Sequence, residues 1–177
     1  QRPHLTQGFR LNATGGRFLF STMHLRSKLC DGASGANEDQ GDGQGCFNGM
    51  RLAQSSALID HWASLRNSTG IEAQLIMGDF NAYAQEDPID RLRAAGLIHC
   101  APPDGHTFGF EGLYGELDHV FCTAAMNTTI TGTAVWHINA DEPPTLDYRD
   151  ANASRYQPNA YRSGDHDPVL VGINGAD

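Results

Sequence analysis

The sequence has no long hydrophobic run and few cationic residues. None of its apolar stretches approaches the roughly 18 residues that a membrane-spanning helix needs, so no membrane partner is expected. It has 12 Lys and Arg residues against 21 Asp and Glu residues, and its formal net charge is −9. Because Lys and Arg normally make the phosphate contacts, tight nucleic-acid binding would need a divalent metal ion or basic surface from elsewhere. The acidity also fits an extracellular protein, in which charge serves solubility.

The spacing Cys-x-x-Cys is absent too, which argues against a zinc site built from the four cysteines. An even number of cysteines instead indicates disulfides, of which three pairings are possible. We predict the pairs Cys30–Cys46 and Cys100–Cys122, because each pair is close in sequence and encloses a single excursion of the chain. Closing the first loop is worth about 3 kcal/mol in the chain-entropy model. Two disulfides predict a secreted protein.

A hydrophobic content of 40% and 20 glycines are typical of one globular domain rich in strands and turns. The predicted helices are Met50–Arg66, capped by Asn48, and Pro88–Ala95, capped by Asp87 and stopped by Gly96. The predicted strands are Phe18–Leu25, Gln74–Phe80, Leu97–His99, Thr107–Phe110, Leu117–Cys122, Ile130–Val135 and Val169–Ile173. The segment Asn139–Gly164 is predicted to be a long loop, either functional or disordered.

Polar residues follow or begin several of these apolar strands. The apolar run Leu75–Met77 leads into Gly78-Asp79-Phe80-Asn81. Asn81 lies two residues after Asp79, so the two side chains point the same way if the strand continues. A carboxylate beside an amide suits a water molecule, a metal ion or a phosphate oxygen. A strand that runs into an Asx turn would give the same pattern. His24, Asp118 and the Asp165–His166 pair are placed similarly, which favours a site for phosphoryl transfer.

The order of these motifs resembles the second half of the endonuclease/exonuclease/phosphatase superfamily. The matching motifs are His24-Leu25, Gly78-Asp79-Phe80-Asn81-Ala82, Leu117-Asp118-His119-Val120 and Gly164-Asp165-His166-Asp167-Pro168-Val169. The resemblance extends from Phe18 to Ile173, and the Cys30–Cys46 insertion is similar to a loop of the secreted bacterial nucleases. It implies an α/β fold: part of a four-layer sandwich of the deoxyribonuclease I type, with a mixed, mostly antiparallel sheet flanked by helices.

The resemblance implies metal-dependent phosphodiester hydrolysis by a secreted bacterial DNA endonuclease. Asp79 would orient or deprotonate the attacking water, and Asn81 would fix that water or a phosphate oxygen. His166 would contact the phosphate or transfer a proton, with Asp118 holding its imidazole in one tautomer. His24 would be the second histidine of the site. The sequence leaves open which histidine is the acid and which is the base.

The same resemblance implies that Mg²⁺ or Mn²⁺ binds at Asp165, with Asp79 and Asn81 as further ligands. A second ion is conceivable, because the loop Asp31–Asp42 carries four carboxylates among glycines. Calcium could bind there, but the regular Asp-x-Asp-x-Asp-Gly ladder of an EF-hand is missing, and an ordinary solvated loop is the alternative.

The family's principal metal ligand, a Glu on an early strand, has no counterpart in Gln1–Gly16. We therefore expect residues 1–177 to be the C-terminal portion of one such domain, with the N-terminal metal-binding half as a partner and DNA or another nucleic acid as substrate. The alternatives are a sphingomyelinase-like or phosphatase-like phosphoesterase, and a catalytically inactive fragment or binding module.

The remaining histidines lie outside these motifs or beside them. His119 is expected to point outward from its strand, as the neighbour of Asp118. Asp167 is expected only to shape a turn with Pro168. No motif surrounds the other histidines, which we expect to be surface or packing residues: His4, His61, His99, His106 and His137.

Overall fold

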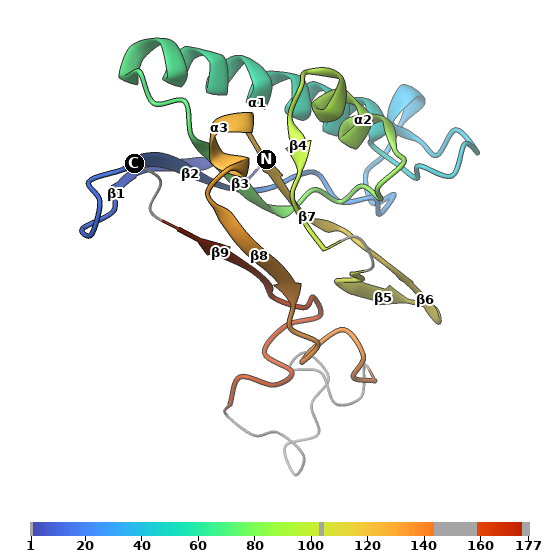
Figure 1. The fold of residues 1–177 in the computed structure, drawn as a ribbon. Coiled ribbons are helices and arrows are strands. Elements are labelled where there is room, and N and C mark those ends of the chain that lie inside the picture. Colours follow the sequence, from blue (N-terminus) through green and yellow to red (C-terminus); the bar gives the residue numbers. More distant parts are fainter. Residues whose placement is uncertain (1, 103–104, 144–158, 175–177) are drawn as a thin grey trace.

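Residues 2–102, 105–143 and 159–174 are described by a computed structural model (Figure 1). A five-stranded sheet with the order β1–β2–β3–β7–β4 forms its centre. Its strands are β1 (Leu5–Arg10), β2 (Arg17–His24), β3 (Gln74–Asp79), β7 (Asp118–Cys122) and β4 (Ile98–His99). Only β2 and β3 are parallel; the other neighbouring strands are antiparallel. The predicted α/β class with a mixed, mostly antiparallel sheet is confirmed.

Helices cover one side of this sheet, which we name the helix face (Figure 1). Helix α1 (Asn48–Thr69) makes the crossover between the parallel strands β2 and β3, a connection that cannot be a short turn. Helix α2 (Asp87–Ala94) packs against α1. Apolar side chains from both helices and from the strands fill the space between them: Met23, Leu25, Leu58, Trp62, Ile76, Phe80, Ala82, Ile89, Leu92 and Phe121.

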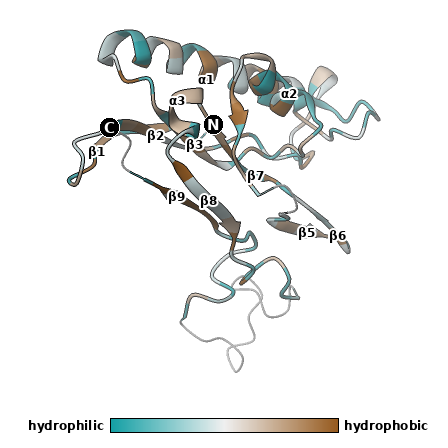
Figure 2. Ribbon diagram, in the orientation of Figure 1, coloured by the Kyte–Doolittle hydropathy of each residue, from teal (hydrophilic) through white to brown (hydrophobic). Residues whose placement is uncertain are grey.

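A two-stranded antiparallel sheet packs against the opposite side, which we name the hairpin face. Its strands are β8 (Ile130–Val135) and β9 (Val169–Ile173), and the short helix α3 (Ala124–Asn127) connects β7 to β8. A second core forms there around Leu75, Val120 and Met126, with Val169 and Val171 packed against it. Figure 2 shows the apolar residues gathered on the strands and polar residues along the loop before α1. A further small hairpin comprises β5 (Phe108–Phe110) and β6 (Leu113–Gly115).

Several element boundaries differ from the prediction. The predicted cap of α1 at Asn48 is wrong: the helix includes Asn48, and Phe47 precedes it with φ of 61°. The helix also continues to Thr69, where Gly70 in the left-handed region ends it. The first residue of α2 is Asp87 and its cap is Glu86, one residue earlier than predicted. Of the predicted long loop, residues 144–158 lie outside the described ranges, and the described parts contain no helix or strand.

Four short elements were not predicted at all. They are β1, β6, α3 and a 3₁₀ turn at Gly35–Asn37. Strand β1 lies at the edge of the sheet and nearly all of its residues are exposed, so its sequence has no alternation of buried and exposed positions. The others span three or four residues, which is too short for a periodic signal.

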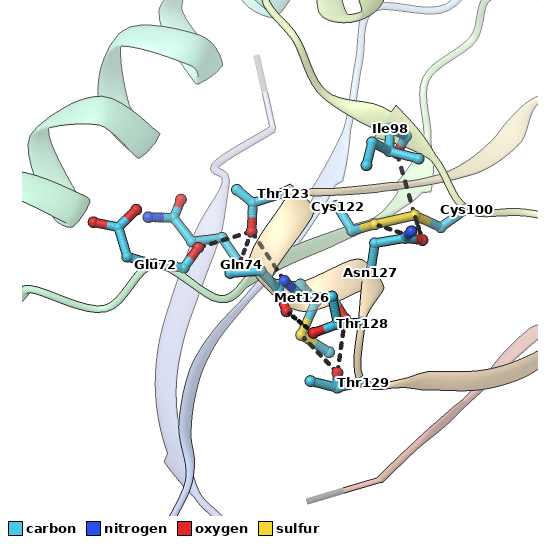
Figure 3. Close-up of a disulfide and its surroundings, with 11 residues drawn as sticks. Glu72, Gln74, Ile98, Cys100, Cys122, Thr123, Met126, Asn127, Thr128 and Thr129 are labelled. Carbon is cyan, nitrogen blue, oxygen red and sulfur yellow. Dashed lines mark hydrogen bonds between the residues drawn. A yellow bond between two sulfur atoms is a disulfide. The ribbon is translucent and has the colours of Figure 1, made fainter. Parts of the chain in front are cut away.

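Both predicted disulfides are confirmed. Cys30 and Cys46 close the polar loop before α1, with 5.1 Å between their Cα atoms. Cys100 and Cys122 link the segment after β4 to the end of β7 (Figure 3). Both sulfurs of this second pair lie within 4 Å of the Asn127 side-chain oxygen. It therefore anchors the edge strand β4 next to α3.

Candidate active site

Three polar residues lie in one row across neighbouring strands. In the register of the sheet, His24 of β2 is opposite Asp79 of β3, and Asp79 is opposite Asp118 of β7. Side chains alternate along a strand, and Leu75, Val120 and their alternate neighbours belong to the core of the hairpin face. The row therefore projects from the hairpin face, at the ends of the strands.

A glycine allows two of these strands to approach closely just before the row. Gly78 has φ of 153°, and a Cβ atom added there would lie 2.1 Å from the carbonyl oxygen of Met23. No side chain fits in that space, so position 78 requires glycine. The Gly in Gly-Asp-x-Asn thus sets the approach of β2 and β3 that brings His24 next to Asp79.

The Asp79 carboxylate accepts two hydrogen bonds from Asn81 and lies next to His24. Its Oδ2 atom lies 3.0 Å from His24 Nε2 and 2.9 Å from Asn81 Nδ2. Its Oδ1 atom accepts the backbone N–H of Asn81 at 2.7 Å, which is an Asx turn. The interpretation as an Asx turn is confirmed, and this turn places the carboxylate and the amide side by side. Asn81 has φ of 47°, a left-handed conformation that Asn adopts more readily than most residues.

His166 joins the row from a distant part of the chain. Its Nδ1 atom lies 2.6 Å from Asp118 Oδ2, and because a carboxylate only accepts, Nδ1 carries the hydrogen and Nε2 is left for other partners. Burial alone lowers the pKa of His166, but the hydrogen bond and charge of Asp118, with the charges of Asp79 and Asp165, raise that pKa above its ordinary value. An isolated antiparallel β-bridge joins the backbones of His166 and Phe108, and the centroids of their rings are 4.6 Å apart.

Asp167 has a larger part than the predicted turn. Its side chain is buried, and Oδ1 accepts the backbone N–H groups of Ile138, Asn139 and Ala140 at 2.8–3.0 Å. Its Oδ2 atom lies 2.8 Å from His137 Nδ1. Burial alone would raise the pKa of this carboxyl, but these hydrogen bonds lower it below its ordinary value. Asp167 thereby fixes the segment that carries His166 to the segment that follows β8.

Thr107 is a second residue that sequence reasoning missed. It is fully buried, and its hydroxyl oxygen accepts the backbone N–H groups of Leu117 and Asp118 at 3.1 and 3.0 Å. Its carbonyl oxygen accepts the N–H of Asp167 at 2.8 Å. Thr107 therefore aligns Asp118 with the His166 segment. The sequence around Thr107 gives no signal for this role. A role for Asp167 could have been predicted, because it is the second acid of the motif Asp165-His166-Asp167.

The site has the donors that a hard divalent cation requires. One ligand atom each from Asp79, Asp118 and His166 can be chosen so that all lie within 4.8 Å of one another. Two of them are carboxylate oxygens, the ligands that Mg²⁺ prefers. Asp165, expected to be a metal ligand, precedes His166 and is near enough for its charge to affect that histidine. The donor set therefore fits a magnesium-class ion.

The loop considered for calcium has local uses for its carboxylates. Asp39 Oδ1 accepts the N–H of Gly41 at 2.8 Å, and Asp42 Oδ1 accepts the N–H of Gln44 at 3.0 Å. These are Asx-type turns within the loop. Among the described residues, the clusters of three or more ligand side chains do not include this loop. Calcium binding there stays an expectation from composition.

The expectation that His119 points outward is wrong. Its side chain is fully buried on the helix face, between β4 and the turn that contains Ala82. Alternation along β7 does place it opposite Asp118, as expected, but that opposite side is covered by helices and not by solvent. Burial lowers the pKa of His119 below its ordinary value.

Comparison with known proteins identifies the fold. No family model and no curated protein matches the sequence. Solved structures do match: an endonuclease/exonuclease/phosphatase family protein of Bacteroides thetaiotaomicron has a TM-score of 0.60 at 16% identity, over 95% of this chain and 54% of that one. The fold is that of the endonuclease/exonuclease/phosphatase superfamily. In that fold, the row of His24, Asp79 and Asp118 comes from the motifs that carry the sequence resemblance.

Two further structures with the superfamily fold differ in what their names say they act on. The mannosyl-6-phosphatase of Bacteroides thetaiotaomicron has a TM-score of 0.58 at 16% identity, over 97% of this chain and 56% of that one. The endonuclease domain of the telomere-specific retrotransposon TRAS1 has a TM-score of 0.53 at 17% identity, over 96% of this chain and 63% of that one. The chain thus spans about half the length of the solved structures that it matches. Within the described ranges, no helix is long and apolar enough to cross a membrane.

Proposed function

We propose that the protein is a metal-dependent phosphodiesterase, and that it acts as a secreted DNA endonuclease. The observation that carries this proposal is the junction of two acid–histidine pairs: His24 with Asp79, and His166 with Asp118. Hydrolysis of a phosphodiester needs an oriented water, stabilisation of the phosphoryl oxygens and a proton for the leaving oxygen. The two pairs supply groups for each of these needs: ligand atoms of Asp79, Asp118 and His166 lie within 4.8 Å of one another, and His24 lies 3.0 Å from Asp79.

His166 exchanges the proton in this mechanism. Asp118 holds Nδ1–H, so Nε2 faces the substrate, and the raised pKa keeps a larger fraction of the imidazole protonated near neutral pH. A protonated Nε2 donates to a phosphoryl oxygen or to the leaving oxygen. Asp79 and Asn81, which lie side by side, orient the attacking water. His24 is paired with Asp79 through Nε2, so Nδ1 of His24 is left for the substrate.

A Mg²⁺ or Mn²⁺ ion would be held by oxygen atoms of Asp79 and Asn81, with Asp165, the neighbour of His166, as a further ligand. Asp118, whose carboxylate lies in the same group of ligand atoms as Asp79, would stay hydrogen-bonded to His166. The amide nitrogen of Asn81 donates to Leu25 O and to Asp79, which fixes the orientation of this side chain beside the carboxylate. When bound, the ion supplies charge that offsets the phosphoryl oxygens. We further propose that the chain is the C-terminal portion of its domain, since it covers about half of each matched structure, and that the N-terminal half contributes further ligands.

A phosphatase-like activity on a small phosphoester is the second candidate. The net charge of −9 favours it, because a small substrate needs less basic surface than a DNA duplex does. The similarity to the mannosyl-6-phosphatase is in fold alone and agrees with either substrate.

The test compares three substrates with the protein in its longest natural form: supercoiled plasmid, a phosphodiester chromogen and a phosphomonoester chromogen, each with Mg²⁺, with Mn²⁺ and with chelator. We expect metal-dependent nicking of the plasmid and a loss of about a hundredfold or more in Asp79→Asn and His166→Gln. Asp60→Asn is the matched control, because Asp60 is an exposed acid on α1. Cleavage of the monoester alone would assign a phosphatase. Full activity in His166→Gln, or no metal-dependent hydrolysis of any substrate, would refute the proposal.

A further inference from the structure

A second cluster of ligand-type side chains lies on the other side of the sheet from the candidate active site. It consists of His99 at the end of β4, Glu116 just before β7 and His119 within β7. His99 is opposite Phe121 in the register, and Phe121 belongs to the core of the helix face. His119 lies two residues from Phe121 on the same strand, so both histidines project from that face.

The three side chains converge on one point. His99 Nε2 lies 3.0 Å from His119 Nδ1 and 3.1 Å from Glu116 Oε1, and His119 Nδ1 lies 3.4 Å from Glu116 Oε2. Ligand bonds of about 2.0–2.1 Å at tetrahedral angles separate neighbouring ligand atoms by about 3.3 Å. The observed separations therefore leave a position within bonding distance of all three side chains.

The nitrogen of His119 that faces this point has a lone pair, which accepts the hydrogen of His99 Nε2 when no metal ion is bound. The opposite ring nitrogen, Nε2, lies 2.7 Å from the carbonyl oxygen of Ala82, and a carbonyl only accepts. Nε2 therefore carries the hydrogen, which leaves the lone pair of neutral His119 on Nδ1. Fixing one ring nitrogen by a backbone carbonyl is the arrangement by which proteins orient metal-bound histidines.

We propose that His99, Glu116 and His119 bind a zinc-class transition-metal ion, at a structural site distinct from the proposed catalytic site. Two imidazoles and one carboxylate suit Zn²⁺ and not Mg²⁺, which takes oxygen ligands. The side chain of His119 is fully buried, while those of His99 and Glu116 are 19% and 12% exposed. Solvent can therefore reach the outer side of the cluster and provide a fourth ligand.

A metal ion at this position would tie together three parts of the fold. His99 comes from the two-residue edge strand β4, and His119 comes from β7. Through Nε2, His119 also holds the backbone of Ala82, the residue after Asn81. The ion would thus stabilise the edge of the sheet and the turn that presents Asp79 and Asn81, without touching either of them.

Zinc binding by isothermal titration tests the proposal on metal-stripped protein made without a polyhistidine tag. Wild-type protein is expected to bind one Zn²⁺ at this site, and His99→Gln and Glu116→Gln are each expected to weaken that binding at least tenfold. Two variants serve as controls. Asp118→Asn alters the proposed catalytic row, and His106→Gln alters an exposed cluster formed with His137 and Asp141. Neither control should weaken this binding event.

A second readout separates metal ligation from simple hydrogen bonding within the cluster. Nitrogen-15 spectra of the imidazoles should show Nδ1 of His119 and Nε2 of His99 shifting when Zn²⁺ is added, while the His106 resonances stay in place. Circular dichroism verifies that both ligand variants are folded. The proposal is overturned if wild-type protein at micromolar concentration binds no zinc when the Zn²⁺ concentration is about 100 times that of the protein. It is equally overturned if both ligand variants bind zinc as tightly as wild type. These results do not depend on hydrolysis.

Discussion

Replacing Gly78 by Ala tests how closely β2 and β3 must approach to form the candidate site. The added Cβ atom would lie 2.1 Å from the carbonyl oxygen of Met23 and 3.0 Å from its carbonyl carbon. Both atoms belong to the backbone of the neighbouring strand, so no rotamer change relieves the contact. Either the strands separate or the peptide groups rotate, and His24 and Asp79 are the next pair in the register.

The expected cost has two parts. Forcing an extra methyl group into a packed interior costs about 1–3 kcal/mol. A non-glycine residue at φ of 153° adds about 1–3 kcal/mol of backbone strain. We therefore expect Gly78→Ala to lower the free energy of unfolding by about 2–6 kcal/mol, a large share of the 5–15 kcal/mol typical of a domain. Hydrolysis should fall too, since the displaced backbone carries Asp79.

Equilibrium urea unfolding with intact disulfides measures this cost against two other glycines. Gly96 has φ of 84° with open space around its added Cβ, so Gly96→Ala carries only a strain cost of about 1–2 kcal/mol. Gly49 lies in the first turn of α1, also in open space, and Gly49→Ala should be neutral or stabilising by up to about 1 kcal/mol. If Gly78→Ala costs no more than Gly96→Ala, the close approach of the strands is not what requires glycine at position 78.

Three other predictions concern titration and cross-linking. Nuclear magnetic resonance should place the pKa of His166 above 6.5, and Asp118→Asn should bring it below that of wild type, because the hydrogen bond and the charge of Asp118 no longer oppose the effect of burial. The stabilisation from this pair should be complete below about pH 6.5 and disappear as pH rises through the folded pKa. Asp167→Ala should cost about 3 kcal/mol or more by urea unfolding, since it leaves buried N–H groups without acceptors. In wild type, the Asp167 contribution should be present above about pH 4 and fade as pH falls through its lowered pKa. Replacing Cys30 and Cys46 by Ser should lower the unfolding free energy by about 3 kcal/mol and leave the initial rate of hydrolysis nearly unchanged.

The sequence predicted most of the longer strands well because each is a short apolar run bounded by polar residues. The boundaries of β8 and β9 agree with the prediction at both ends, and β3 and β7 differ by one residue. The pairing of His24, Asp79 and Asp118 follows from strand register, which a sequence alone does not state. The motif resemblance placed the three residues in one site but did not predict which of them lie opposite one another.

Side chains that support the site were harder to predict than the site itself. The position of His119 depends on which face of β7 the helices cover, and strand alternation alone is symmetric between the two faces. Asp167 acts on backbone N–H groups of residues 138–140, which lie almost 30 positions earlier in the chain. In the zinc-class cluster, Glu116 and His119 lie three residues apart, but His99 joins them only through the pairing of β4 with β7, which the sequence does not state.

The two halves of the candidate site are attached to the fold in different ways. Asp79 and Asp118 lie on adjacent strands within the central sheet. His166 lies outside that sheet and is held by a bridge to Phe108, by hydrogen bonds to Asn139 and Asp118, and by the anchoring bonds of Asp167. Segments held by few contacts open locally at a lower free energy than the strands of a core. We therefore expect His166, which exchanges the proton in the proposed mechanism, to leave more readily than the carboxylates do. Such an opening would interrupt turnover without unfolding the protein, and amide hydrogen exchange would detect it in the residues around position 166 before any loss of protection in β3.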